Sequence, residues 1–474
     1  MADRRPLAVV TNWRDLEHPQ AGGAELVVDH IARELVDQGY RTVLLASAVD
    51  GRPRQEEVSG YTVRRRGGQF TVYAWALLWL LMHRRSVSVV IDSQNGIPFF
   101  SPLAVSRRTP CLLLLHHIHQ EQFGLYFPAP VAMVGRLLEG FFSRLVYGER
   151  AIITVSPSTR QGAREILGLR GPIRIAPPGW AVTLDLGRGL PAKTEHPSVV
   201  TVGRLVPHKR TAMAVEAVAA LRATIPGLTL DVVGGGTELE PLQKLAAELG
   251  IADAVTFHPG CTDEVRDAVT ARSWLCVNAS EGEGWGISVI EANGLGTPVL
   301  AYSRPGLRDS IQDGVNGWLL ADDVPLADGV AASLGQLGTT QQRADAAWAA
   351  YEWAMGFTWQ EMGRRVLDAV ALEERRLGLS HPDRRGGADV STVVHVPSRL
   401  LPAAWDPALR DGDVLTHVND GVDLFFAGAD TAGARVALRR IGLAERVAEA
   451  DVEYRVAKRR DHLTPPQRSL RRSA

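Results

Sequence analysis

The chain has 474 residues, of which 45% are hydrophobic, and a formal net charge of −1 at pH 7. This length suits two or three domains with cores of their own, and the near-neutral charge argues against nucleic acid as the main partner. The three cysteines are too few and too widely spaced for a disulfide framework or a metal site, which favours a reducing, cytoplasmic environment.

Residues 1–190 alternate short apolar runs with helical patterns. Over Ala24–Gln38 the apolar residues recur at helical spacing. The short runs read as buried parallel strands, which we expect at 7–10, 42–46, 87–91, 111–115 and 151–155. This alternation predicts a doubly wound α/β domain.

The same pattern returns after Gly187 to Ser198, a segment whose prolines and mixed charge predict a linker. We expect a second domain of the same class over residues 198–357, with strands at 199–202, 228–233, 254–257, 275–278 and 298–301. A helix is expected over Thr358–Gly378. Beyond a linker at Ser380 to Asp389, residues 390–474 predict a small appended α+β region of unknown role, with a basic, disordered tail after about residue 460.

Two glutamates, Glu283 and Glu291, flank the start of a helical stretch that follows a glycine-rich loop. Gly284, Gly286 and Ile287 stand where the helix is expected to begin. Free N–H groups at a helix start bind phosphate, and carboxylates accept hydrogen bonds from sugar and ribose hydroxyls. The block therefore predicts a site for a nucleotide-sugar, against the simpler interpretation of two solvated glutamates.

Two cations follow the first strand of the second domain. Arg204 and Lys209 lie in the loop after the buried run that ends at Gly203, and Lys209 is one of only four lysines in the chain. Cations at strand ends stabilise the charge that grows on a diphosphate as it leaves. The alternative is a solvated basic loop.

The first domain contributes two further motifs. The tandem glycines Gly22 and Gly23 open the first long helix and form an anion-binding turn. His116, His117 and His119 follow the strand at 111–115, where side chains face the crevice of such a sheet. His116 is favoured as the histidine that faces a ligand, and chelation of a metal by His117 and His119 is the minority alternative.

Together these motifs resemble the retaining glycosyltransferases of family 4, over roughly residues 7–378. The resemblance implies the GT-B fold, in which two Rossmann-like domains face each other and a last helix, here 358–378, returns to the first. It implies transfer of a sugar from a nucleotide-diphosphate donor to a saccharide or lipid-linked acceptor, in cell-envelope polysaccharide or glycolipid synthesis. We expect no cofactor and no metal, because Arg204, Lys209 and helix dipoles can neutralise the diphosphate.

The resemblance also implies roles for the motif residues. Glu283 holds the transferred sugar and His116 bonds near its reacting centre, while Glu291 binds the ribose. The remaining donor-binding positions are Gly22, Gly23, Arg204, Lys209, Gly284, Gly286 and Ile287.

Three alternatives stay open at this point. The same fold serves nucleotide-sugar epimerases and hydrolases, and a non-catalytic scaffold could retain it.

The triple glycine Gly234–Gly236 lacks the spaced fingerprint of a dinucleotide site, so hydride chemistry is not supported. Asp411-Gly412-Asp413 has the Asp-x-Asp form of a metal site but lies among turn residues, which favours a turn.

Peripheral contact with the inner face of the cell membrane is a further expectation. Trp75, Trp79 and Leu80 with Arg84 and Arg85 could form an amphipathic surface, as could Phe123 to Phe142 with Arg144. Core-facing helices are the simpler interpretation. The most apolar helical run, 72–82, is about half the length that spans a bilayer.

Overall fold

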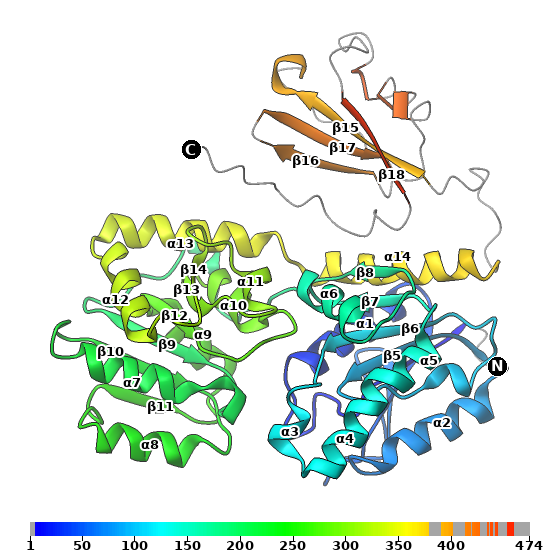
Figure 1. Ribbon diagram of the computed structural model, residues 1–474, viewed down its shortest axis with the longest axis horizontal. Helices are drawn as coiled ribbons and strands as arrows, with labels where there is room; N and C mark the ends of the chain where they lie inside the picture. Colours follow the sequence, from blue (N-terminus) through cyan, green and yellow to red (C-terminus); the bar gives the residue numbers. More distant parts are fainter. Residues whose placement is uncertain are drawn as a thin grey trace. The chain divides into compact units, whose positions relative to one another are not determined.

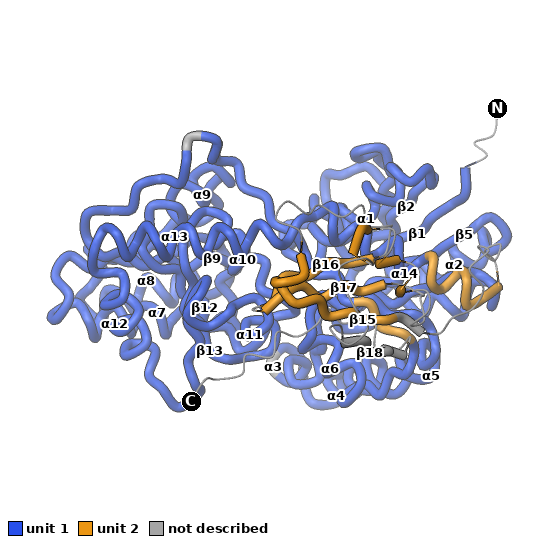
Figure 2. The backbone as a smooth tube through the Cα atoms, turned by 90° about the horizontal axis from the view of Figure 1, so that it is seen from above, with its two compact units in different colours: residues 1–171, 175–370 blue, residues 172–174, 371–474 orange. Residues whose placement is uncertain are grey.

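The structure is a computed structural model that describes residues 5–378, 390–401, 413–418, 420–426, 434–435, 437–438, 441–443 and 453–458. The chain forms two compact units, residues 1–171 with 175–370 and residues 172–174 with 371–474 (Figure 2). No helix in the described part of the chain has both the length and the apolar composition needed to cross a bilayer.

The first domain is built on an eight-stranded sheet with helices on both sides (Figure 1). Its strand pairs from β4 to β7 are parallel, and β3 joins β4 antiparallel at the edge. The order is β3 (Gln55–Val58), β4 (Tyr61–Arg65), β2 (Arg41–Ala46), β1 (Leu7–Thr11), β5 (Val87–Asn95), β6 (Cys111–His117), β7 (Ile152–Thr154) and β8 (Ile173–Ile175).

The helices of this domain follow the strands as a doubly wound fold requires. They are α1 (Gly23–Asp37), α2 (Thr71–His83), η1 (Ser101–Leu103), α3 (Phe123–Tyr126), α4 (Ala129–Leu137), the π-helical turn η2 (Leu138–Phe142), α5 (Ser143–Tyr147) and α6 (Pro157–Glu165).

The packing of α2 contradicts the expectation that Trp79 and Leu80 contribute to a membrane surface. Trp79 and Leu80 are buried in the core, so they cannot form a membrane surface, whereas Leu78, Leu81 and Met82 are exposed. The helix is apolar on every side, and its composition therefore could not tell which side packs inward.

The second domain has a six-stranded sheet in which every pair of neighbouring strands is parallel. The order is β11 (Val255–His258), β10 (Thr229–Val233), β9 (Ser198–Val202), β12 (Leu275–Asn278), β13 (Val299–Tyr302) and β14 (Gly317–Leu320). Numbered within the domain this is 3-2-1-4-5-6, the Rossmann order, in which the chain reverses direction across the sheet between β9 and β12. The prediction of two Rossmann-like domains is confirmed.

Helices pack around this second sheet. They are η4 (Pro207–Lys209), α7 (Thr211–Leu221), α8 (Leu239–Glu248), α9 (Asp263–Arg272), α10 (Ile287–Gly294), α11 (Leu307–Ser310), α12 (Leu326–Gln336) and α13 (Thr340–Met355). The 3-10 turn η3 (Leu186–Arg188) lies beside the expected linker.

The next helix, α14 (Trp359–Arg376), returns to the first domain. The Trp359 ring stacks on His30 of α1, with ring centroids 3.9 Å apart and planes 7° apart. Met362 and Val366 join the core cluster that contains Ile31. Burial of this apolar face holds the return crossing in place.

The appended region contains a four-stranded antiparallel sheet, in the order β16 (Val414–Val418), β17 (Gly421–Phe426), β15 (Val390–Pro397) and β18 (Glu453–Lys458), and a 3-10 turn η5 (Ser398–Leu400) follows β15. Val394, Val422 and Leu424 form a core with the helical residues Ala434 and Leu438. The expected linker 380–389, Asp411-Gly412 and the tail after 460 lie outside the described residues.

Candidate active site

The site lies where the second sheet reverses, at the carboxyl ends of β9 and β12. The loop after β9 carries Arg204 and Lys209, and the loop after β12 carries Glu283. Arg210 adopts a left-handed conformation (φ 50°), and its Nε donates to the carbonyl of Ala279, 2.7 Å away, which joins the two loops. Ligands of open α/β sheets bind at this reversal point.

Lys209 and Glu283 form an ion pair between these loops. Ser280 Oγ also donates to Glu283 Oε1, at 2.8 Å. Burial raises the pKa of the Glu283 carboxyl, but the charge and hydrogen bond of Lys209 and the bond from Ser280 outweigh it and hold that pKa below its usual value. Glu283 is therefore a carboxylate at neutral pH, fixed in position from two sides.

The loop after β10 packs against the loop that carries Arg204 and Lys209, which we call the cationic loop. Leu205 N donates to the Gly235 carbonyl (2.8 Å), and a Cβ on Gly236 would lie 2.2 Å from the carbonyl oxygen of Leu205. The absence of a side chain at Gly236 thus permits backbone-to-backbone packing of the two loops next to Arg204.

Helix α10 begins at the site and carries the second glutamate. Gly286 precedes it in the left-handed region (φ 91°), and Ile287 is its first residue. Glu291 is half-buried, and burial raises its pKa to about 7 against the opposing charge of Arg266. Its carboxylate accepts no hydrogen bond within the described part of the chain, so it is available to a hydroxyl donor.

The glycine pair of the first domain faces these loops. A Cβ on Gly22 would lie 3.7 Å from Arg204 Nε, and one on Gly23 only 2.9 Å from Ile287 Cδ1. Glu25 shapes the turn by accepting from Gly22 N at 2.7 Å. The turn therefore closes over both the cationic loop and the start of α10.

The histidines divide between two directions. Strand β6 extends to His117, two residues further than expected, and its pairing with β5 is irregular there, because Gln94 pairs with Leu115 and Asn95 with His117, which leaves His116 between them. The two histidines therefore have to be placed by their contacts. His116 Nε2 lies 2.8 Å from Ser93 Oγ, whereas His117 Nε2 lies 3.7 Å from where a Cβ on Gly282 would be. The structure thus places His117, rather than His116, beside Glu283.

Both imidazoles are neutral at pH 7. Burial, helped by His119, lowers the pKa of His116 and that of His117 to about 3. The His119 ring packs edge-on against His117, with ring centroids 5.1 Å apart, and its Nδ1 lies 3.2 Å from the carbonyl oxygen of His117. The backbone N–H of His119 donates to Glu139. No group of three His, Cys, Asp or Glu side chains suited to a metal occurs among the residues that the structure describes.

Sequence reasoning missed two contacts at the site. Tyr126 of α3 hydrogen-bonds His208, next to Lys209, and so joins the two domains. Arg14, in the loop after β1, pairs with Glu25 at 3.0 Å. Position after a strand end could have identified Arg14, but no local signal could have paired Tyr126 with a residue 82 positions away.

Two family matches cover most of the chain. Residues 187–347 match the family described as Glycosyl transferases group 1, and residues 21–184 match Glycosyltransferase Family 4. The chain belongs to glycosyltransferase family 4. The motifs from which the resemblance was inferred lie within these two ranges.

Individual relatives of this glycosyltransferase agree. D-inositol 3-phosphate glycosyltransferase of Acidothermus cellulolyticus is 28% identical over 418 residues, covering 79% of this chain and 92% of the relative. A GDP-mannose-dependent alpha-(1-6)-phosphatidylinositol monomannoside mannosyltransferase of Mycolicibacterium smegmatis is 33% identical over 186 residues, 37% of this chain and 48% of the relative.

Solved structures share the fold. The sucrose-phosphate synthase of Thermosynechococcus elongatus superposes with a TM-score of 0.65 at 20% identity, covering 80% of this chain and 100% of that one. HepE of Anabaena, solved in complex with UDP-glucose, gives 0.58 at 16% identity, with 77% and 99% covered.

Proposed function

We propose that this glycosyltransferase transfers a sugar, with retention of anomeric configuration, from a nucleotide-diphosphate donor to a hydroxyl of a saccharide or lipid-linked acceptor. The observation that carries the proposal is the convergence of Lys209, Glu283 and the start of α10 at the reversal point of the second sheet. Cations, a helix N-terminus and a fixed carboxylate there suit a diphosphate with its sugar attached.

In this proposal the residues of the site have separate roles. Arg204, Lys209 and the N-terminus of α10 stabilise the leaving diphosphate, and Glu291 accepts from the ribose hydroxyls. Glu283 and His117 position the transferred sugar. A neutral His117 next to the sugar donates or accepts a hydrogen bond without adding charge to the site.

The same arrangement supports transfer without a metal ion. Two side-chain cations and the helix dipole neutralise the diphosphate in the way that a divalent cation would. Full activity in the presence of a chelator is expected, and a strict requirement for added metal would contradict this part of the proposal.

The names of the relatives direct the choice of acceptor. D-inositol 3-phosphate glycosyltransferases and phosphatidylinositol monomannoside mannosyltransferases both act, by name, on inositol-containing acceptors. A phosphorylated inositol, free or lipid-linked, is therefore the first acceptor class to test, with a place in cell-envelope glycolipid synthesis.

Contact with the inner face of a membrane completes the proposal. On the helical segment from α4 to α5, Leu137, Phe141 and Leu145 are 47%, 58% and 71% exposed. An apolar helical face bordered by arginines suits the interfacial region of a bilayer.

The test is a panel of UDP-, GDP-, ADP- and dTDP-sugars, each with and without an inositol phosphate acceptor, followed by NMR of the product anomer. Product with the donor's configuration supports the proposal. Inversion of the product, or donor epimerised or consumed equally fast without acceptor, would contradict it. If the protein binds none of these donors, the alternative of a non-catalytic scaffold protein is favoured.

A further inference from the structure

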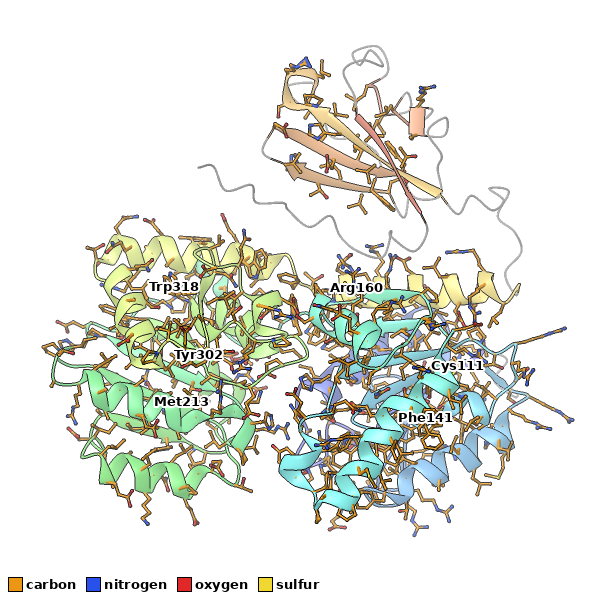
Figure 3. The ribbon with its side chains drawn as sticks, viewed as in Figure 1. Cys111, Phe141, Arg160, Met213, Tyr302 and Trp318 are labelled. Carbon is orange, nitrogen blue, oxygen red and sulfur yellow. The ribbon has the colours of Figure 1, made fainter. Side chains whose placement is uncertain are left out.

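The first turn of α6, in the first domain, borders the loop of Glu283. Helix α6 begins at Pro157, and Arg160 on its first turn is labelled in Figure 3. Thr159 Oγ1 donates to the carbonyl of Gly284, 3.2 Å away. Because Gly284 follows Glu283 directly, the backbone of this loop is in contact with the first domain at the start of α6.

The first turn of α6 has one backbone donor that its own domain leaves unpaired. Pro157 has no N–H. The N–H of Thr159 donates to Ser156 Oγ at 3.0 Å, and the N–H of Arg160 donates to the Ser156 carbonyl at the same distance. Among the described residues of the first domain, no acceptor remains for the N–H of Ser158.

The second domain supplies this acceptor. Ser158 N donates to Asp309 Oδ2 at 3.0 Å, although 151 positions separate the two residues. Arg308 Nε adds a bond to Ser158 Oγ at 3.2 Å. A carboxylate at a helix N-terminus also interacts favourably with the partial positive charge there. We call the contact between Asp309 and the Ser158 N–H the interdomain cap.

Helix α11, which carries Asp309, also supports the loop of Glu283. Glu283 N donates at 3.0 Å to the carbonyl of Pro305, which lies just before this helix. The carbonyl of Ser310, at the end of α11, accepts from Trp353 Nε1 at 2.8 Å. The helix is therefore fixed within the second domain at both ends, so a force on Asp309 reaches the backbone of Glu283.

We propose that Asp309 is a positioning residue for sugar transfer. It caps α6 when the two Rossmann-like domains are together, and it thereby holds the loop of Glu283 against the first domain. When the domains separate, water solvates both the carboxylate and the Ser158 N–H, and the loop loses this support. The role for the sugar rests on the proposed function of Glu283, whereas the interdomain cap itself does not.

This role has a kinetic signature. The cap forms only when the domains meet, so it favours the arrangement in which chemistry occurs over the open one. Binding of the nucleotide to the second domain needs no such contact. Loss of the cap should therefore lower kcat while the KM for the donor changes little.

Hydrogen exchange of the full chain, followed by mass spectrometry, tests the cap directly. With and without UDP-glucose or GDP-mannose, Asp309→Ala should increase exchange of one amide at the start of α6 about tenfold, the size expected for a carboxylate at a helix N-terminus. Asp313→Ala is the matched control, because Asp313 Oδ1 accepts from Leu319 N at 2.9 Å within the second domain. If exchange at α6 in Asp309→Ala equals that of the unaltered protein, the cap is overturned.

Steady-state kinetics tests the positioning role. Asp309→Ala is expected to lower kcat roughly tenfold, with the KM for the donor changed less than about twofold. Asp309→Asn keeps an acceptor oxygen but loses the charge, so it should lose only about threefold. Ser158→Ala keeps the N–H and removes only the bond from Arg308, so its kcat should stay near that of the unaltered protein.

Thermal unfolding establishes that each variant is folded. An unchanged kcat in Asp309→Ala, or a loss in Asp313→Ala of equal size, would overturn the positioning role even if the exchange at α6 responds. If no nucleotide-sugar supports transfer, the proposed function fails, and hydrogen exchange still tests the cap without substrate.

Discussion

Lys209 and Glu283 form an ion pair although 74 residues separate them in the chain. The pair exists because β9 and β12 are neighbours at the reversal point of the second sheet, which brings the loops after both strands to one place. A donor diphosphate would compete with Glu283 for the ammonium group, so the two residues act as a unit.

Replacing either member of this pair should remove most of the activity. Lys209→Ala and Glu283→Ala are each expected to lower kcat/KM by two to three orders of magnitude, or about 3–4 kcal/mol, as for groups that stabilise charge in a transition state. Steady-state kinetics with the best donor measures this. Lys244→Ala is the matched control, because Lys244 is 79% exposed on α8, and an equal loss there would contradict the assignment.

The two neighbouring histidines should respond differently. His117→Ala is expected to lower kcat about 100-fold, because the side chain faces the loop of Glu283. His116→Ala should mainly lower the free energy of unfolding, by about 1–2 kcal/mol, since it removes one of the two buried hydrogen bonds of Ser93 Oγ and leaves only the bond to Asn12. Kinetics and thermal unfolding of both variants test this, and the reverse pattern would support the sugar-facing role that the sequence predicts for His116.

Glu291 should make donor binding and stability depend on pH in opposite directions. Its pKa is raised to about 7, so the group loses its proton near neutrality and donor affinity rises with pH through that range. Stability from this group is complete below its unfolded pKa and falls as pH rises through 7, because the folded state holds the proton more tightly.

The variant Glu291→Gln tests both effects. It should bind donor weakly at every pH and should gain more stability at pH 8 than at pH 5, by on the order of 2 kcal/mol. Titration calorimetry and unfolding at the two pH values measure this. A gain that is the same at both would show that the carboxyl titrates normally.

Gly284 should tolerate no side chain. A Cβ there would lie 2.1 Å from the carbonyl oxygen of His116, so Gly284→Ala is expected to separate the two loops and reduce kcat at least tenfold. Gly235→Ala is the control, because nothing lies within 4 Å of where its Cβ would be and its conformation is open to other residues. Activity of Gly284→Ala equal to that of the control would contradict the packing.

Tyr126→Phe should weaken donor binding without changing the rate of the chemical step. Loss of the hydrogen bond to His208 removes a link between the domains next to Lys209, worth about 1 kcal/mol, and KM for the donor should rise about fivefold with kcat nearly unchanged. Unaltered KM would show that the link is not used during turnover.

The sequence by itself determined the fold class and the chemistry of the motifs. Buried strands can be recognised from continuous apolar runs, as in 275–278, which the structure reproduces as β12. Short polar strands cannot, so β3, with the sequence Gln55–Val58 and little burial, was missed. The glutamate block and the cationic loop could be recognised because their glycines and charges lie close together in the chain.

Only the tertiary structure decided which side chains meet. Which of His116 and His117 lies beside the loop of Glu283 depends on the irregular pairing of β5 with the end of β6, which regular strand alternation does not predict. Which side of α2 is buried depends on its neighbours, since every side is apolar. The bond between Tyr126 and His208 joins segments 82 positions apart, and no local pattern in the sequence predicts it.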